Sequence, residues 1–562
     1  MGKLFNFFSP NTLYKVFIFG SFNDEHHQKR NKIGGPPMES TVDTSIPYLT
    51  SLSYLQTQSL NKENAKSQEA LSKSIEHIST GLRVINAGDD LAGFAIADRF
   101  DVQVQGMTKA IQNTNEALTA ARVAESSLNE YTDILGYMKE LADKATHKNL
   151  DIDDRQTLQK EIENLQDRLK GIADETTFRG RKLLDGTYRT QNIQVGQDVG
   201  QVMSVSLKTA RPDQVGLHQV VSDGTMVVPQ AQMDYDSIQN SVASTDSITI
   251  QGHMGAEYIE IESEYSAKEI ADAINQKSDL TGVTAKAETF LKIYDMTDIG
   301  GSTPDIDVSF TMHGSSEVSI SATLSALGDS STLYDLEPLY DELQSAYAST
   351  HIKPELSADH QAIHLHSEEG YNIGIEEFSS SISAGFTKLE YAGLEFDGET
   401  TINPTGAFLN SLLFDMVDSV MASGYVELQS DEPFIVFSGS TDALFSSSSA
   451  TYLPTLKALD AIDITFKDDA EEALDIIEKA TTYVEGIRSD VQAYESGFES
   501  IINRLESAAE QMEDSKHRIV DADMTHETMN SSTATIQIQS QNALLTQANR
   551  LIPEYSLFLL RQ

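Results

Sequence analysis

Histidine and carboxylate side chains are the groups of this chain whose spacing could hold a metal ion. His364 and His366 alternate along a predicted strand, so their rings share one face, and Asp359 and His360 come shortly before them. Imidazole nitrogens and carboxylate oxygens are the zinc ligands available to a chain without Cys. Solvated histidines on surface strands are far commoner than metal centres, so we predict no metal site here.

The motifs of common hydrolases and nucleotide-binding proteins are absent from the sequence. His526-Glu527 is followed by Thr528-Met529-Asn530, which breaks the His-Glu-x-x-His pattern of zinc proteases. No Gly-x-Ser-x-Gly occurs, and no Gly-rich loop ends in Lys-Ser or Lys-Thr. Acid pairs such as Glu368-Glu369 could bind Ca²⁺, but an acidic surface explains them more simply. We therefore predict no catalytic residue and no cofactor, and a protein that is not an enzyme.

Charge and composition restrict the partners of the chain. Its 562 residues carry a net charge of −46, from 86 acidic and 40 basic side chains. Such a surface repels nucleic acid and anionic membrane, so we expect neither as a partner. The apolar stretch Leu4–Phe22 is interrupted by Pro10 and by polar residues, and it falls short of the ~18 continuous apolar residues of a membrane span. No membrane insertion is expected.

The same stretch is a poor signal peptide. A signal peptide needs a small-residue cleavage site, and Gly20-Ser21 matches this requirement badly. We interpret residues 1–37 as an extension that is not native, with translation starting at Met38. A disordered tail is the alternative.

Helix-forming composition brackets a β-rich middle. Residues 51–148 contain no Pro and few Gly, and residues 468–514 again have a helical composition. Between them, residues 178–460 are rich in Ser, Thr, Gly and β-branched side chains. The sequence therefore predicts a mainly α terminal rod of long paired, coiled-coil-like helices and a β-rich α+β central insert.

The C-terminal helix carries the clearest periodic signal. A second apolar row, Ala480 to Ala508, is offset by three from a first row, which is the pattern of a coiled-coil face. The N-terminal half has a weaker seam, in which Glu125 interrupts one row. Two long seams in one chain need partners, and we predict that they pack on each other; two separate helical bundles are the alternative. The proposed seam residues are Ile477, Val484, Val491, Phe498, Leu505 and Met512 on one helix and Ile111, Leu118 and Leu128 on the other.

The middle of the chain contains two further patterns. Turn residues at 178–186 precede a predicted hairpin formed by residues 192–195 and 202–207. Further on, the order strand, strand, helix, strand, strand occurs twice, over residues 247–293 and 308–378. In the first copy, the last two strands are expected at 282–285 and 291–293.

Residues 41–210 and 457–562, nearly half of the chain, resemble bacterial flagellin. The most specific stretch runs from Ser79 to Arg99, and it contains the family's landmark residues Arg83, Asn86, Asp89, Asp90, Gly93, Asp98 and Arg99, with Asn86 shifted by one place. Phe178–Gly186 resembles another family motif, with Arg179 in place of Asn. Shorter terminal matches are Val42–Ser45, Arg518–Asp523, Gln537–Asn549 and Leu557–Arg561. The central repeat is similar to an insertion module of some flagellins and hook-associated proteins.

The resemblance implies a division of the chain into segments. The filament-core segments would be residues 38–80 and 521–562, the rod residues 81–210 and 457–520, and the variable outer insert residues 211–456. Within them, residues of about 41–70 and 531–562 are rich in Gln, Asn, Ser and Thr, so we expect these residues to be disordered in the free subunit and to fold on assembly.

The resemblance also implies a function. The chain would be a structural subunit that polymerises into the flagellar filament for motility, outside the cell, after export without a cleaved Sec signal. Implied partners are further copies of the chain, a flagellar export chaperone, the type III export apparatus, and hook-associated and cap proteins. The alternatives are the hook–filament junction protein and a surface adhesin or glycan-binding variant.

One helix of the family is a contact site of the innate immune flagellin receptor, and it typically reads Gln-Arg-Val-Arg-Glu-Leu-Ala. The aligned residues here are 136–142, in which Glu140 and Leu141 are kept and Tyr137 replaces the first Arg. Glu161 matches a supporting acid on the next helix. We take Glu140, Leu141 and Glu161 as candidate receptor contacts, and expect weakened activation because Tyr137 cannot supply a charged planar donor.

Overall fold

The computed structural model describes residues 45–559 apart from 148–149, 241, 243–245, 300–304, 327–332, 382–385, 395–400, 403–407, 411–416 and 440–441. The extension 1–37 and the motif residues 42–44 lie outside this part of the chain. The chain forms two compact units. The first contains the described residues up to Phe94 and those from Val520 onward, and the second runs from Ala95 to Ile519.

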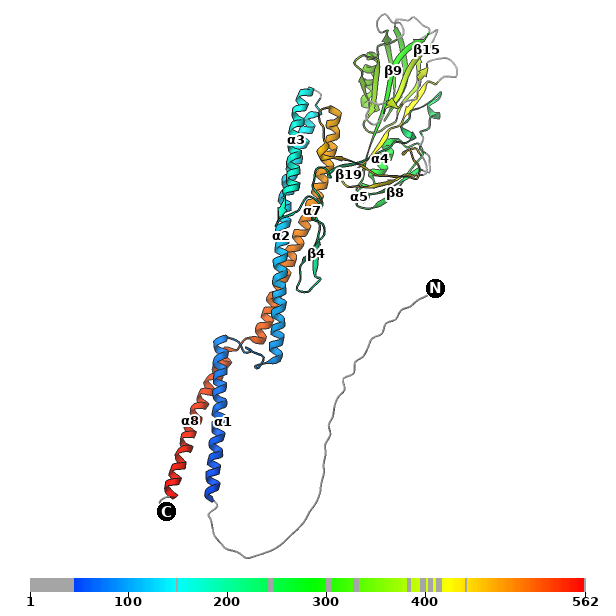
Figure 1. Ribbon diagram of the computed structural model, residues 1–562. Coiled ribbons are helices and arrows are strands. Elements are labelled where there is room, and N and C mark those ends of the chain that lie inside the picture. Colours follow the sequence, from blue (N-terminus) through cyan, green and yellow to red (C-terminus); the bar gives the residue numbers. More distant parts are fainter. Residues whose placement is uncertain are drawn as a thin grey trace, which may run out of the picture. The chain divides into compact units, whose positions relative to one another are not determined.

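Two long helices form most of the first unit. Helix α1 (Ser45–Thr80) and helix α8 (Met524–Leu559) lie side by side (Figure 1). Helix α1 ends at Gly81, whose positive φ of 75° allows its N–H to donate to the His77 carbonyl at 2.8 Å. The first and last helices of the described residues are therefore paired within one unit.

Three helices form the rod of the second unit. They are α2 (Leu91–Ala145), α3 (Ile152–Glu175) and α7 (Lys467–Val520). Asp151 caps α3 by accepting the Asp154 N–H at 2.8 Å. The Arg155 guanidinium donates to the carbonyls of Ala145, His147 and Leu150, which satisfies backbone oxygens at the turn between α2 and α3.

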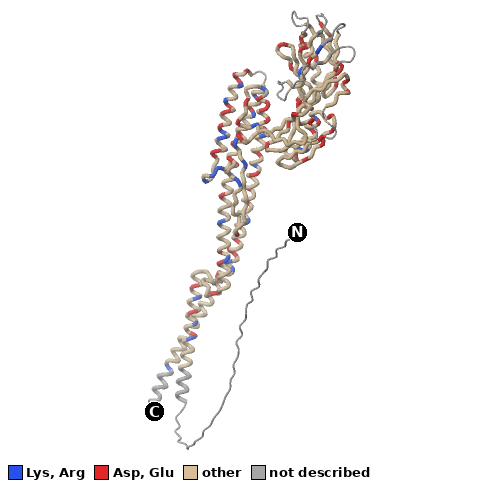
Figure 2. The backbone as a smooth tube through the Cα atoms, turned by 45° about the vertical axis from the view of Figure 1, so that its right-hand side comes forward, with Lys and Arg blue, Asp and Glu red and all other residues tan. Residues whose placement is uncertain are grey.

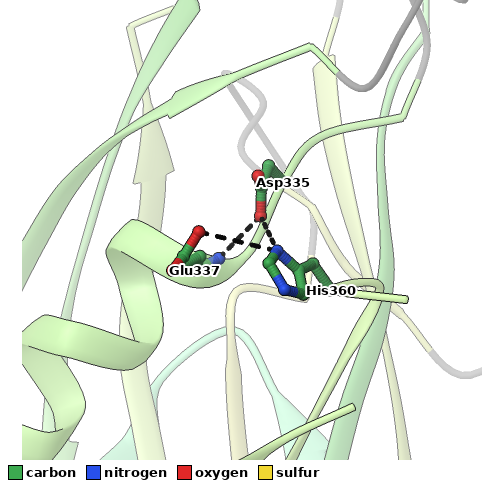
Figure 3. A group of neighbouring side chains, drawn as sticks. All are labelled: Asp335, Glu337 and His360. Atoms are coloured by element: carbon green, nitrogen blue, oxygen red, sulfur yellow. Dashed lines mark hydrogen bonds and ion pairs between the residues drawn. The ribbon is translucent and has the colours of Figure 1, made fainter. Parts of the chain in front are cut away.

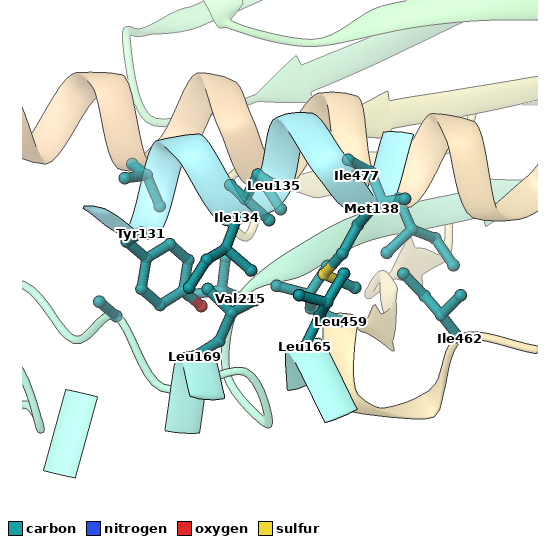
Figure 4. Packing of buried hydrophobic residues seen from close by; sticks show 14 of the residues in the cluster. Tyr131, Ile134, Leu135, Met138, Leu165, Leu169, Val215, Leu459, Ile462 and Ile477 are labelled. Atoms are coloured by element: carbon teal, nitrogen blue, oxygen red, sulfur yellow. The ribbon is translucent and has the colours of Figure 1, made fainter. Parts of the chain in front are cut away.

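The rod core joins residues that are far apart in the sequence. Figure 4 shows Leu135 and Met138 of α2 close to Leu165 of α3 and Ile477 of α7. This arrangement confirms the predicted mainly α rod of paired helices. None of the helices in the described part of the chain is both long enough and apolar enough to span a membrane.

Two short hairpins cover the middle of the rod. Strands β1 (Thr177–Phe178) and β2 (Arg181–Lys182) form the first, and β3 (Gln191–Gln194) and β4 (Val202–Val205) form the second, close to the hairpin predicted from the sequence. Val205 packs against Leu118 of α2 and Phe498 of α7, so the second hairpin lies on the seam between these helices.

The insert is β-rich, as the sequence predicts, and its described residues form two hydrophobic clusters. The first cluster includes helix α4 and a four-stranded sheet in the order β21-β20-β7-β8. The elements around it are β5 (Gly216–Val221), η1 (Thr225–Val227), β7 (Asp246–Gln251), β8 (Ala256–Ile261), α4 (Ala267–Asn275), α5 (Ser278–Thr281), β19 (Tyr425–Ser430), β20 (Ile435–Phe437), β21 (Thr451–Tyr452), β22 (Thr455–Ala458) and η3 (Leu459–Ala461).

The second cluster is enclosed by helix α6, by a five-stranded sheet in the order β11-β10-β14-β18-β6 and by part of a nine-stranded sheet. Its elements are β6 (Gln230–Gln232), η2 (Tyr235–Ser237), β9 (Thr284–Ile299), β10 (Asp305–His313), β11 (Glu317–Ser325), α6 (Glu337–Thr350), β12 (Lys353–Leu356), β13 (Ala362–Ser367), β14 (Ile373–Ser380), β15 (Phe386–Leu394), β16 (Thr401–Ile402), β17 (Phe408–Asn410) and β18 (Ser419–Ala422).

The predicted repeat differs from the structure in its first copy. The two strands expected at 282–285 and 291–293 are one continuous strand, β9. Its first part pairs with β19 and the next part pairs with β13, so one strand serves both clusters. The partner of β9 changes from β19 to β13 between Glu288 and Thr289, and the run of apolar residues is interrupted at the same place. In the sequence, this interruption looks like the boundary between two strands.

The sequence-based start of the insert at residue 211 also needs correction. Val215 and Leu217 are buried in the same cluster as Leu128 and Val484, so they belong to the rod core. Strands β5 and β22 run beside each other, with Gln219 opposite Thr455. The insert therefore leaves the rod at this strand pair.

Candidate functional site

A loop between α1 and α2 holds most of the flagellin-like motif residues. The Asp89 carboxylate accepts the backbone N–H groups of Ile85 and Asn86, at 3.1 and 3.2 Å, and lies 2.9 Å from the Lys73 ammonium of α1. The hydrogen bond from Lys73 and those from the loop backbone lower the pKa of Asp89 to about 2. Asn86 stabilises the same turn by accepting the Gly88 N–H at 2.8 Å.

The neighbouring carboxylate begins helix α2. Asp90 accepts the N–H groups of Ala92 and Gly93, at 3.1 and 3.0 Å, which is the bonding of a helix N-cap. Arg83 lies 4.0 Å from Asp90. The motif Asp pair therefore has a local structural role: one acid ties the loop to α1, and the other starts α2.

The remaining motif residues, Asp98 and Arg99, lie on α2 in the second unit. Both side chains are exposed, and the described residues include no ion-pair partner for either. The structure gives them no role in the loop that holds Asp89 and Asp90.

The N-terminal loop pairs with the segment that the sequence matched to a C-terminal motif. Leu82 forms a β-bridge with Asp521, the N–H of Arg83 donates to the Val520 carbonyl at 2.6 Å, and the N–H of Ala522 donates to the Gly81 carbonyl at 2.9 Å. The N-terminal motif and the C-terminal motif are thus hydrogen-bonded to each other. The sequence identified each motif separately and gave no signal of this pairing.

The seam residues of the rod meet in three clusters. Leu128 is buried with Ile477, Val484 and Val491, and Leu118 with Phe498. Leu505 is buried against Met107 and Ala110, with Ile111 and Met512 packed at the edge of this group. The structure thus places every proposed seam residue in a contact between α2 and α7.

The interface between α1 and α8 is polar instead. Its buried residues include Asn64, Ser67, Ser74 and His77 of α1 and Glu527 of α8. His77 Nδ1 lies 3.3 Å from the Glu527 carboxylate, and the Asn64 amide donates to Asn542 at 2.7 Å. In paired helices, polar residues at such positions fix the register at a cost in stability. The polar contacts therefore fix the register of α1 against α8, but the two helices gain little stability from hydrophobic burial.

The candidate receptor residues differ in exposure. Glu140 and Glu161 are exposed, and Tyr137 is 60% exposed, so a partner could reach all three. Leu141 is only 7% exposed and belongs to the rod core. The sequence-based choice of Leu141 as a surface contact is therefore wrong, because its helix turns this side chain inward.

His360 and His366, which are candidate metal ligands in the sequence, have different neighbours in the structure. His366 stacks on Phe290, with ring centroids 4.4 Å apart, and lies 3.3 Å from Glu288. His360 instead approaches Asp335, with Nδ1 3.1 Å from the carboxylate, and Glu337 at 3.6 Å (Figure 3).

These three side chains could each offer one ligand atom to a metal ion. Asp335 also accepts the Glu337 N–H at 2.9 Å at the start of α6, so capping and ion pairing already account for their positions. The sequence offered no signal for this group, because residues 335 and 360 meet only through the fold.

One buried carboxyl lies in the insert near the rod. Glu427 on β19 is 5% exposed, and burial raises its pKa to about 7. Its carboxylate accepts the Gln429 amide at 2.9 Å. Lys286 lies opposite Glu427 on β9 and forms an ion pair with Asp475 of α7.

Comparisons with known proteins match both ends of the chain. A family model of the bacterial flagellin N-terminal helical region matches residues 51–189, and a model of the C-terminal helical region matches residues 474–553. The B-type flagellin of Pseudomonas aeruginosa is 28% identical over 528 residues, which cover 93% of this chain and 100% of that protein.

Two further proteins show similarity over long segments. The flagellin of Salmonella choleraesuis is 26% identical over 545 residues, which cover 91% of this chain and 98% of that protein. A crystal structure of flagellar hook-associated protein 3 from Legionella pneumophila is 11% identical, covers 75% of this chain and 98% of that one, and has a TM-score of 0.30.

Proposed function

Because the chain belongs to the bacterial flagellin family, a family of structural proteins, and is a subunit of the flagellar filament, we propose a division of roles among its segments. The segments 38–80 and 521–562 line the filament core, and the rod of α2, α3 and α7 forms the surrounding wall. The insert projects into solvent.

The observation that carries this proposal is the pairing of the segments that adjoin α1 and α8. The bridge from Leu82 to Asp521 joins the motif loop to the start of α8, so α1 and α8 act as one element in assembly. A polymer contact made by one end would then order the other end as well.

The polar interface between α1 and α8 supports folding on assembly. Ala534 is the apolar side chain that is fully buried in the described part of this helix pair, whereas the rod seam is apolar over most of its length. A helix pair with so little buried apolar surface cannot offset its conformational entropy alone. In the filament, neighbouring subunits would cover its outer faces.

Deletion of residues 531–562 tests this assignment. The truncated subunit should remain soluble and should retain the thermal unfolding transition of the rod, because the rod core lies outside the deleted segment. It should fail to elongate filament seeds. Normal filaments from the truncated subunit would contradict the proposed role of the terminal helices.

The partners follow from the same proposal. The chain polymerises with copies of itself, is bound before export by a flagellar chaperone, and passes through the type III export apparatus without a cleaved Sec signal. It then meets hook-associated and cap proteins at the ends of the filament. Glu140 and Glu161 form the remaining part of a contact surface for the innate flagellin receptor, with Tyr137 in place of the usual Arg.

A further inference from the structure

A short basic segment interrupts this strongly acidic chain. Residues 179–210 contain five Lys and Arg against two Asp, a net +3 in a chain of net −46. By contrast, residues 211–460 contain 8 basic and 40 acidic residues, a net −32. Figure 2 shows Asp and Glu scattered over the insert with few Lys or Arg, whereas both signs occur along the rod. Copies of such a chain repel one another unless basic groups lie where they touch.

Part of this segment forms a compact exposed group on the rod, here called the basic patch. Arg181 on β2 donates to the Gln191 side chain at 2.7 Å, and the Gln191 amide donates to the Arg189 carbonyl at 2.8 Å, so the two arginines are neighbours. Lys182 follows Arg181, and Arg179 occupies the turn between β1 and β2. All four basic side chains are exposed.

Two members of the basic patch are not neutralised by any described residue. Arg179 forms an ion pair with Glu116 at 2.6 Å, and Lys182 lies 3.6 Å from Asp174. Arg181 and Arg189 have no carboxylate partner in the described part of the chain. The Arg189 guanidinium donates to the Gly186 carbonyl, at 3.4 Å. These two guanidinium groups are available to another molecule.

An acidic counterpart lies on helix α7, here called the acidic stripe. Glu506, Glu510 and Glu513 follow one another at intervals of four and three, so they share one face of the helix. This face is exposed and lies away from Leu505, which packs on α2. Among the described residues, none forms an ion pair with these acids. Like charges at such spacings destabilise a helix by about 0.2–0.5 kcal/mol per pair. A basic binding partner would reduce this repulsion between the glutamates.

The basic patch and the acidic stripe of one copy cannot reach each other. Arg179 contacts α2 at Glu116, while Leu505, just before the stripe, packs against Met107 and Ala110. Because α7 runs antiparallel to α2, the middle of the stripe lies about 20 Å along the rod from the patch. Long side chains span less than half of this distance. An ion pair between the two surfaces therefore needs two copies.

We propose that the basic patch of one subunit docks onto the acidic stripe of a neighbouring subunit in the filament. This inference rests on the assignment of the chain as a filament subunit and adds which surfaces meet. Because patch and stripe are different surfaces, the contact is heterologous, and such a contact generates an open helical polymer rather than a closed dimer. Arg181 and Arg189 face Glu506 and Glu510 across the interface, and salt weakens the contact.

A charge-swap experiment tests the proposal with the full-length chain. Purified subunits are added to filament seeds, and elongation is followed by light scattering. The variant Arg181→Glu/Arg189→Glu should elongate at least about tenfold more slowly, because attraction becomes repulsion at two positions. Adding Glu506→Lys/Glu510→Lys to the same chain should restore elongation to within about threefold of the wild-type rate.

A matched control separates the site from the net charge. Lys160→Glu/Lys170→Glu changes the net charge equally at exposed positions of α3 outside the basic patch. It should leave elongation within about twofold of wild type. An equal loss in this control, or a failure of the swap to restore elongation, would overturn the proposed contact. If the wild-type chain itself does not elongate seeds, the filament assignment fails instead. Circular dichroism of each free variant verifies that the rod remains folded.

Discussion

The Lys73 ammonium of helix α1 lies 2.9 Å from the Asp89 carboxylate, which also accepts two N–H groups of its own loop. One side chain thus connects a long helix to the loop that pairs with Val520–Ala522. Because the pKa of Asp89 is lowered to about 2, the stabilisation by its charge is complete above the ordinary Asp value near 4 and is lost as the pH falls towards 2.

Replacing Asp89 by Asn should therefore weaken the filament in a pH-dependent way. At pH 7, Asp89→Asn filaments should dissociate at a lower temperature than wild type, because Lys73 loses its partner. The difference should shrink as the pH falls from about 4 to about 2, where wild-type Asp89 also becomes neutral. Light scattering during heating measures this. Asp98→Asn is the control, since Asp98 is exposed and makes no such contacts among the described residues; an equal effect there would contradict the assigned role.

The buried carboxyl of Glu427 has the opposite pH dependence. Its pKa is raised to about 7, so its contribution to stability is complete below the ordinary Glu value near 4.5 and is lost as the pH rises through 7. Glu427→Gln should therefore raise the unfolding temperature of the insert at pH 8, by an amount corresponding to at most about 3 kcal/mol, and should have little effect at pH 4.5. Calorimetry at both pH values measures this. The exposed Glu342→Gln should show no comparable gain at pH 8.

The rod seam should not tolerate a charge. Val491 is fully buried between α2 and α7, so Val491→Asp places a carboxylate without a partner in an apolar core. We expect a loss of several kcal/mol of stability and a clearly lower midpoint of thermal unfolding by circular dichroism. The control Ser489→Asp adds the same charge at an exposed position of the same helix. Equal midpoints for the two variants would argue against this seam.

The insert should be dispensable for polymerisation if it is cut at the correct place. Because Gln219 lies opposite Thr455, residues 220–454 can be replaced by a short Gly-rich turn that joins the two strands. This shortened subunit keeps Val215 and Leu217 in the rod core and should form filaments visible by electron microscopy. A cut at residues 211–456 removes both core residues and should destabilise the rod. Absence of filaments from a folded and exported 220–454 variant would mean that the insert carries assembly contacts.

Receptor activation should depend on the exposed face of α2. Tyr137 is 60% exposed, so Tyr137→Arg can be made without disturbing the core, and it should increase the response of a receptor reporter to the purified monomer. Leu141→Ala should mainly lower the stability of the rod, because Leu141 is buried. Full-strength signalling by the wild-type monomer would contradict the proposed weakening by Tyr137.

The sequence was informative where a regular pattern repeats and uninformative where the fold joins distant residues. The seven-residue spacing from Ile477 to Met512 identified the buried face of α7, because a coiled-coil face follows directly from helix geometry. The bridge of Leu82 to Asp521 and the contact of His360 with Asp335 have no local pattern, since each depends on segments that meet only after folding. The burial of Leu141 could not be read from the motif, because similarity to a motif does not state which way a side chain points.

The strand pair at Gln219 and Thr455 has a consequence for the order of folding. The rod needs α2 and α7 together, although the whole insert separates them in the chain, and such distant contacts form slowly. A folded insert holds Gln219 and Thr455 opposite each other. The flexible connection that must close between α2 and α7 is then short, because the residues of the folded insert no longer contribute to its length. This lowers the entropic cost of bringing α2 and α7 together by about 3–4 kcal/mol. We therefore expect a folded insert to assist the closing of the rod during folding.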